Sequence, residues 1–223
     1  MWSRNPDDDL RELEREILID PLNFELRARL VNLYRRLGNT QEASIAPLID
    51  PLIQRIVNYP EFAVIMAIVN LYTGGGQVYL VGGKVYRNLL ELFHFRNFSA
   101  ETKDWDFLFL GIPSRRPGTV LPEGWEEVRF YHGNFTIRLR HKASGRVVDI
   151  ISIFDSAELI GTSESEVENL ISTQQYREAL EIYFEAVPLN IQALALDLQR
   201  AFMVRWGYKA SLISILKLSV LRV

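Results

Sequence analysis

Three aspartates stand inside segments whose other residues are typical of buried β-strands. Asp104 and Asp106 precede an apolar run over residues 107–110, and Asp149 lies in the middle of the apolar residues 147–151. Residues i and i+2 of a strand point to the same face, so Asp104 and Asp106 share one face. A carboxylate that is buried without a cation, a proton or hydrogen-bond donors is costly. The chain must therefore fold so that these side chains receive partners.

Two kinds of partner would satisfy the three carboxylates. A pair on one strand and a third carboxylate on a neighbouring strand can hold two divalent cations for phosphoryl or nucleotidyl transfer. A structural ion pair between Asp149 and Arg138 or Arg140 would satisfy Asp149 as well. The glycine pair that precedes these residues favours the metal site.

The glycine pair, Gly82 and Gly83, follows the apolar residues 78–81 and opens a predicted helix. Glycines at such a turn let backbone N–H groups approach a phosphate chain next to the positive end of the helix. Lys84 and Arg87 lie one helical turn apart, where they could contact phosphates or simply be exposed helix residues. The pattern predicts a nucleotide-binding turn.

Composition limits the remaining possibilities. The chain has 223 residues, of which 48% are hydrophobic and 24% charged, as expected for a globular protein. It contains no cysteine, which excludes disulfides and thiolate metal sites. The acidic N-terminus has no signal-peptide pattern, and the longest apolar runs are shorter than the roughly 20 residues of a membrane span. We therefore expect a cytoplasmic protein that is not inserted in a membrane.

The pattern of helices and strands changes at the glycines of residues 74–76. Before them we expect an all-α N-terminal domain, residues 1–75. After them we expect an α+β domain, residues 76–223, with a mixed sheet and flanking helices. Its predicted strands are 77–81, 104–110, 127–131, 134–141, 146–154, 193–198, 202–205 and 216–221; its predicted helices are 85–95, 163–184 and 209–213.

Charge is uneven along the second domain. Residues 84–146 contain eleven Lys or Arg against seven Asp or Glu. A basic surface suits a polyanion such as a nucleotide or RNA, and a solvated sheet face would give the same count.

Residues 80–90, LVGGKVYRNLL, followed by Asp104-x-Asp106 and by Asp149, resemble the polymerase-β-like nucleotidyltransferases. Within that superfamily the chain is most similar to the head domain of bacterial poly(A) polymerases and CCA-adding tRNA nucleotidyltransferases, over residues 76–223. It departs from the family at Tyr86 and Arg87, where the family has an arginine followed by an acid. The neck, body and tail of those enzymes do not follow, so complete CCA addition is not expected.

The resemblance implies a chemistry and a set of roles. Asp104 and Asp106 would bind two Mg²⁺ or Mn²⁺ ions, and Asp149 would join the second ion and help to activate the acceptor hydroxyl. Gly82 and Gly83, with Lys84 and Arg87, would bind an NTP such as ATP. The expected acceptor is an RNA 3′ end. The alternatives are an inactive RNA- or protein-binding module and a toxin-like enzyme that modifies tRNA or protein, and the N-terminal helices could recruit a protein partner.

Overall fold

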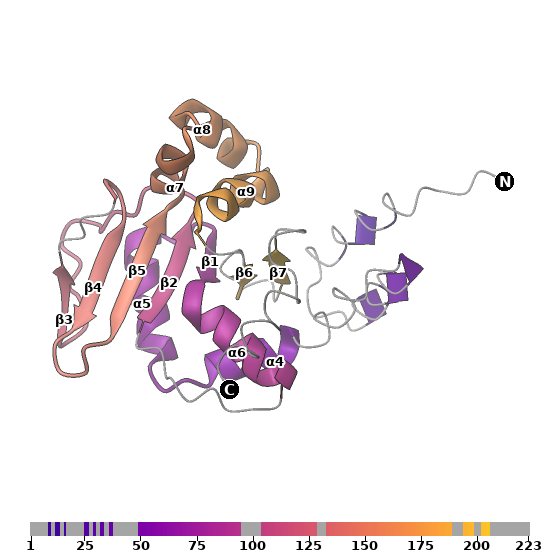
Figure 1. Ribbon diagram of the computed structural model, residues 1–223. Helices are drawn as coiled ribbons and strands as arrows, with labels where there is room; N and C mark the ends of the chain where they lie inside the picture. Colours follow the sequence, from indigo (N-terminus) through magenta and orange to yellow (C-terminus); the bar gives the residue numbers. More distant parts are fainter. Residues whose placement is uncertain are drawn as a thin grey trace.

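The computed structural model describes most of the chain from residue 49 onward (Figure 1). The described ranges are 49–94, 104–128, 133–188, 194–198 and 202–205, together with separate positions between Asp9 and Leu37. The predicted all-α segment before residue 41 is described only at those separate positions. The predicted helix 209–213 and the predicted strand 216–221 lie outside the described ranges.

The centre of the structure is a mixed seven-stranded sheet with the strand order β3-β4-β5-β2-β1-β6-β7. Its strands are β1 (Val78–Val81), β2 (Asp104–Phe109), β3 (Trp125–Val128), β4 (Ile137–His141), β5 (Val147–Ser152), β6 (Leu194–Asp197) and β7 (Phe202–Arg205). β2 and β5 are parallel, whereas every other neighbouring pair is antiparallel. The expected mixed sheet with flanking helices is confirmed.

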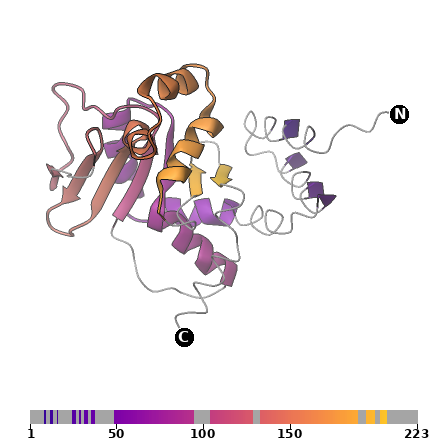
Figure 2. The ribbon, with the colours of Figure 1, turned by 45° about the horizontal axis from the view of Figure 1, so that its top comes forward.

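Helices cover both faces of this sheet. They are α4 (Ile49–Val57), α5 (Phe62–Thr73), α6 (Gly82–His94), α7 (Ile153–Ile160), α8 (Glu164–Ser172) and α9 (Tyr176–Ala186). In Figures 1 and 2, α5 lies behind the sheet, and α7 and α9 lie towards the viewer at its upper end. Side chains tie α5 to its face, because Tyr72 donates a hydrogen bond to Glu127 and Arg146 forms an ion pair of 2.8 Å with Glu61.

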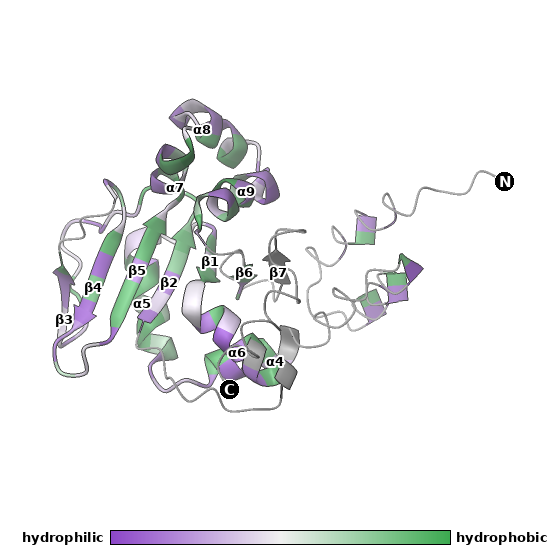
Figure 3. Ribbon diagram, viewed as in Figure 1, coloured by the Kyte–Doolittle hydropathy of each residue, from purple (hydrophilic) through white to green (hydrophobic). Residues whose placement is uncertain are grey.

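One hydrophobic core joins the helices before residue 75 to the sheet. Figure 3 shows apolar residues along β1, β2, β5 and α5. Leu52 and Ile56 of α4 and Ile65 and Ile68 of α5 are fully buried and belong to the same cluster as the sheet residues. The predicted domain boundary at residue 75 therefore does not coincide with a division of the core.

The predicted strand 146–154 is too long. β5 ends at Ser152, whose hydroxyl accepts a hydrogen bond from the Phe154 N–H and so caps α7. The apolar residues after Ser152 continue the run of β5 without a change of composition, which hides the start of a helix. Gly161, with φ +75°, ends α7.

Other predicted boundaries also shift. The predicted helix 163–184 is two helices, α8 and α9, separated by a turn in which Gln174 has a φ of +56°. α6 begins at Gly82, three residues before the predicted start. The predicted strands 127–131 and 134–141 correspond to β3 and β4, which pair antiparallel; β3 ends at Val128 and β4 begins at Ile137 within the described residues.

None of the described helices is by itself long and apolar enough to span a membrane. Only the bent pair Pro51–Val57 and Phe62–Thr73 satisfies length and composition, and its two helices meet at 88°.

We predict that α5 unfolds together with the sheet. Ile68→Ala should lower the free energy of unfolding by about 2–4 kcal/mol, since it removes a fully buried side chain from the shared core. Chemical denaturation followed by circular dichroism and by tryptophan fluorescence should show one common transition. Val64→Ala is the control, because Val64 lies on the same helix and is 42% exposed. A separate early transition for Ile68→Ala would contradict a single core.

Candidate active site

The strand register brings the predicted carboxylates into one row. Val81 pairs with Asp106 across β1 and β2, Asp106 pairs with Asp149 across β2 and β5, and Asp149 pairs with Arg138 across β5 and β4. Directly opposed residues of neighbouring strands share a face. Asp104, two residues before Asp106, lies on that same face. The structure thus gathers all three predicted aspartates on one face of the sheet.

Alternation along β2 explains why polar residues are tolerated there. Trp105 and Phe107 point to the opposite face and are fully buried, with the Trp105 ring 6.1 Å from the ring of Phe62 on α5. On the aspartate face Asp104 is exposed, Asp106 is half-buried and Asp149 is only 6% exposed. The cluster therefore extends from solvent into the protein.

Gly82 permits the close approach of Asp106 to the start of α6. Its φ is +67°, and a Cβ built there would lie 2.2 Å from Oδ2 of Asp106. Asp106 accepts a hydrogen bond from the Gly83 N–H, at the positive end of the helix. The predicted phosphate-binding turn thus donates one of its N–H groups to a carboxylate of the cluster.

Asp106 carries the electrostatic cost of this arrangement. The pKa of its carboxyl is raised to about 7, first by burial and then by the negative charges of Asp149 and Asp104. Arg138 and the Gly83 N–H act in the opposite direction and only partly offset them. The cluster thus holds more negative charge than its described surroundings neutralise, which is the condition that favours binding of a cation.

Arg138 is the partner of the most buried carboxylate. Its Nε donates to Oδ1 of Asp149 at 2.7 Å, and its Nη2 donates to Oδ2 at 2.6 Å. The hydrogen bond to Asp149 raises the pKa of Arg138 most, and the charges of Asp149, Asp104 and Asp106 add to it. The ion pair considered from the sequence therefore forms with Arg138, whereas Arg140 pairs with Glu126 at 2.9 Å.

The donor set suits a hard divalent cation, because Mg²⁺ and Mn²⁺ prefer carboxylate oxygens. Both oxygens of Asp149 are engaged by Arg138, so Asp104 and Asp106 are the ligands not held by that arginine. Across the described ranges, no three His, Cys, Asp or Glu side chains are already arranged to hold a metal ion. A cation bound by all three aspartates would meet the Arg138 guanidinium at Asp149.

The two basic residues of the glycine turn lie in unlike surroundings. Lys84 is fully buried, with its Nζ 3.7 Å from the ring centroid of Tyr59 and 4.6 Å from that of Trp105. It is therefore a core residue and not the exposed helix residue that was one of the two expectations. Arg87 is half-buried, with its guanidinium 5.9 Å from the ring centroid of Tyr86.

Asp155 was not predicted as a site residue, but it helps to hold the segment that leads to Arg138. Its carboxylate accepts hydrogen bonds from the N–H of Asn134 at 2.8 Å and of Phe135 at 3.1 Å, and from the Thr136 hydroxyl. These bonds fix the segment that enters β4, the strand that carries Arg138. The spacing Ser152-x-x-Asp155 is a helix-start signal that could have indicated it.

Tyr183 was missed as well. It extends from α9, and its buried hydroxyl has a raised pKa because of burial and because of the negative charge of Asp106. α9 thus brings the Tyr183 hydroxyl within electrostatic reach of Asp106.

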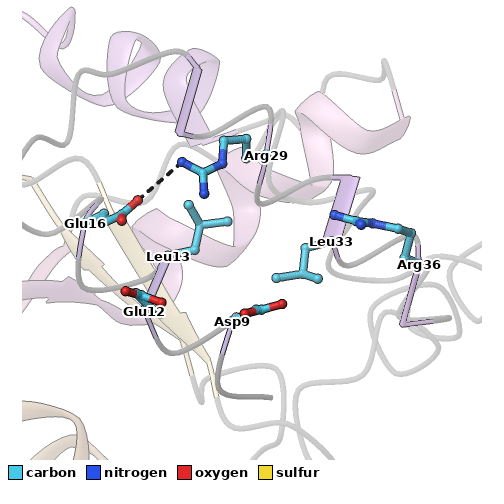
Figure 4. A pocket seen from close by; sticks show the side chains of 7 residues that line it. All are labelled: Asp9, Glu12, Leu13, Glu16, Arg29, Leu33 and Arg36. Atoms are coloured by element: carbon cyan, nitrogen blue, oxygen red, sulfur yellow. Dashed lines mark hydrogen bonds and ion pairs between the residues drawn. The ribbon is translucent and has the colours of Figure 1, made fainter. Parts of the chain in front are cut away.

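A pocket lies elsewhere, among the separate positions of the N-terminal segment (Figure 4). Leu13 and Leu33 form its apolar part, and Glu16 and Arg29 approach to 3.5 Å at its edge. None of the predicted site residues lines it.

We predict that Gly82→Ala destabilises the protein more than an alanine at an equally left-handed glycine. Gly145 has the same φ of +67° and open space around it, so Gly145→Ala should cost only the backbone strain of about 1–2 kcal/mol. Gly82→Ala should cost roughly 1–3 kcal/mol more, because Asp106 must move away from the Gly83 N–H. Denaturation curves of both variants measure the difference. That difference should disappear when Asp106→Ala is introduced; a difference that persists would contradict the clash.

We predict that Asp106 makes the metal-free protein less stable as pH rises. The folded-state pKa of about 7 exceeds the ordinary 3.8, so the stabilising contribution is complete below about pH 4 and is lost as pH rises through about 7. Asp106→Asn should remove this loss and be more stable than the parent protein above pH 7. Thermal unfolding in a chelator across this range measures it, and parallel profiles for the two proteins would contradict it.

Comparison of the chain with models of known protein families, with curated proteins and with solved structures finds no match. The residues themselves and their geometry are therefore the basis for any functional conclusion.

Proposed function

We propose that this protein is a metal-dependent nucleotidyltransferase of the polymerase-β-like kind, similar to the head of poly(A) polymerases and CCA-adding enzymes. It would transfer a nucleoside monophosphate from an NTP to a hydroxyl, with an RNA 3′ end as the expected acceptor. The observation that carries the proposal is the row of aspartates. Asp104, Asp106 and Asp149 lie on one face of two parallel strands, directly beside the Gly82-Gly83 turn at the start of α6.

Charge supports the proposal. Burial and then the two neighbouring carboxylates, Asp149 and Asp104, raise the pKa of Asp106, and Arg138 offsets them only in part. Nothing in the packing of the sheet requires acids at these positions, since the apolar faces of β2 and β5 already form the core. A cation-binding role would explain why acidic residues are kept at these buried positions despite their mutual repulsion.

The roles of the residues follow from their placement. Asp104 and Asp106 would hold two Mg²⁺ or Mn²⁺ ions, and Asp149 would join one of them after release from Arg138. The ions, when bound, supply charge neutralisation at the α-phosphate and a more acidic acceptor hydroxyl. The acceptor hydroxyl would give up its proton to water, its oxygen would bond to the α-phosphorus, and the bond from phosphorus to the bridging oxygen would break so that pyrophosphate leaves.

The start of α6 would position the nucleotide. Its first turn offers backbone N–H groups at the positive end of the helix dipole, which suits the oxygens of a triphosphate. Arg87, one turn further along, is a second candidate contact. Lys84 has no part in this proposal, because it lies in the core.

A second candidate function has its own supporting observation. The bidentate ion pair between Arg138 and Asp149 satisfies the buried carboxylate without a metal, as a non-catalytic protein that binds RNA or another protein would require. A toxin-like enzyme that modifies tRNA or protein would share the chemistry and differ in the acceptor. The N-terminal helices, as a cover or as a partner-binding element, stay a prediction.

The decisive experiment is label transfer. The purified protein is incubated with each α-labelled NTP, Mg²⁺ or Mn²⁺, and a pool of RNA and protein. We expect label on RNA, and we expect Asp104→Asn and Asp149→Asn to reduce transfer by at least about a hundredfold, because each removes a ligand of the charge-stabilising ions.

The control is Glu168→Gln, which removes an exposed carboxylate from α8 and should leave transfer unchanged. Label on protein in place of RNA would identify the toxin-like alternative. No transfer from any NTP, with RNA or protein binding that is equal in the parent and the aspartate variants, would favour the binding module.

A further inference from the structure

We propose that Arg138 is the resident counter-ion of the aspartate cluster and competes directly with a divalent cation for Asp149. This inference rests on the proposed function and concerns how its metal site is loaded. In the protein without a metal ion, this guanidinium would neutralise part of the negative charge of the cluster.

The ion pair between Arg138 and Asp149 is bidentate and charge-assisted. Two charge-assisted hydrogen bonds of 2.7 and 2.6 Å use both oxygens of Asp149, in the parallel geometry that arginine makes with carboxylates. The register of β4 and β5 places the two residues directly opposite each other. The Asp149 side chain is only 9% exposed, so water has little access to replace the guanidinium.

The arginine can also leave. Its side chain is 37% exposed, in contrast to that of its partner, so rotation towards solvent requires no opening of the core. The cost is loss of the ion pair, and the gain is binding of a doubly charged ion to carboxylates that repel one another. Metal binding at Asp149 thus becomes an exchange of one cation for another.

Arg140 provides a matched comparison within the same strand. It lies two residues from Arg138, hence on the same face, but it pairs with Glu126 and is 53% exposed. Removal of either arginine deletes one positive charge from this face. Only removal of Arg138 deletes the group that occupies Asp149.

The test is Mn²⁺ affinity, measured by isothermal titration calorimetry and by electron paramagnetic resonance without any nucleotide. Arg138→Gln should bind Mn²⁺ about ten- to a hundredfold more tightly than the parent protein, since no charged hydrogen bond must be broken. Arg138→Lys should fall between them, because lysine keeps the charge and lacks the fork. Arg140→Gln should change affinity by less than about threefold, as a screened surface charge does.

A second measurement avoids any change at Arg138. The Nε–H resonance of Arg138 should shift on Mg²⁺ titration of the parent protein and remain unmoved by Mg²⁺ in Asp149→Asn. Parent protein that binds Mn²⁺, with Arg138→Gln no tighter and the resonance unchanged, would overturn the competition while leaving the metal site intact. Failure of the parent and all variants to bind Mn²⁺ would overturn both the competition and the proposed function.

Discussion

Mutual repulsion among three carboxylates on one sheet face is the constraint on which the site depends. The pKa of Asp106 is raised by burial first and then by the charges of Asp149 and Asp104. Three features of the chain reduce the cost of keeping this carboxylate charged: the guanidinium of Arg138, the N–H of Gly83, and the left-handed Gly82 that allows the carboxylate to reach this N–H. The strand order, with β4 beside β5 and β1 beside β2, supplies all three from neighbours of the acidic strands.

Apolar residues on the opposite face of β2 and β5 stabilise the sheet and so offset the unfavourable burial of the aspartates. Trp105, Phe107, Val148 and Ile150 are fully buried there. Alternation lets one strand serve both purposes, because each residue step changes the face. The site and the core are thus two sides of β2 and β5, and neither could shift by one residue without exchanging acids for apolar groups.

Much of this could be predicted from local pattern. Alternation placed Asp104 and Asp106 on one face, and the strands β1, β2, β6 and β7 lie within a residue of their predicted bounds. The sequence could not choose between Arg138 and Arg140 as the partner of Asp149, since both lie on one face and only the β4–β5 register separates them.

Two other features were not found from local pattern. The start of α7 follows the apolar run of β5 directly, and the spacing Ser152-x-x-Asp155 is its local sign. Lys84 was expected either to contact phosphates or to be an exposed helix residue, and it is fully buried. Its burial depends on Tyr59 and Trp105, which are distant in sequence and meet only in the folded core.

The burial of Lys84 links the start of α6 to the part of the chain that precedes the sheet. Gly83 donates its N–H to Asp106 on the aspartate face of the sheet. The next residue, Lys84, places its ammonium against the rings of Tyr59 and Trp105. Tyr59 belongs to the connection between α4 and α5, so the chain before the glycines holds the first turn of α6 in place. A fragment that starts at residue 76 would lack one wall of this aromatic enclosure and the α5 side of the core. A fragment that keeps this packing therefore has to start near residue 49, so that it includes α4, Tyr59 and α5.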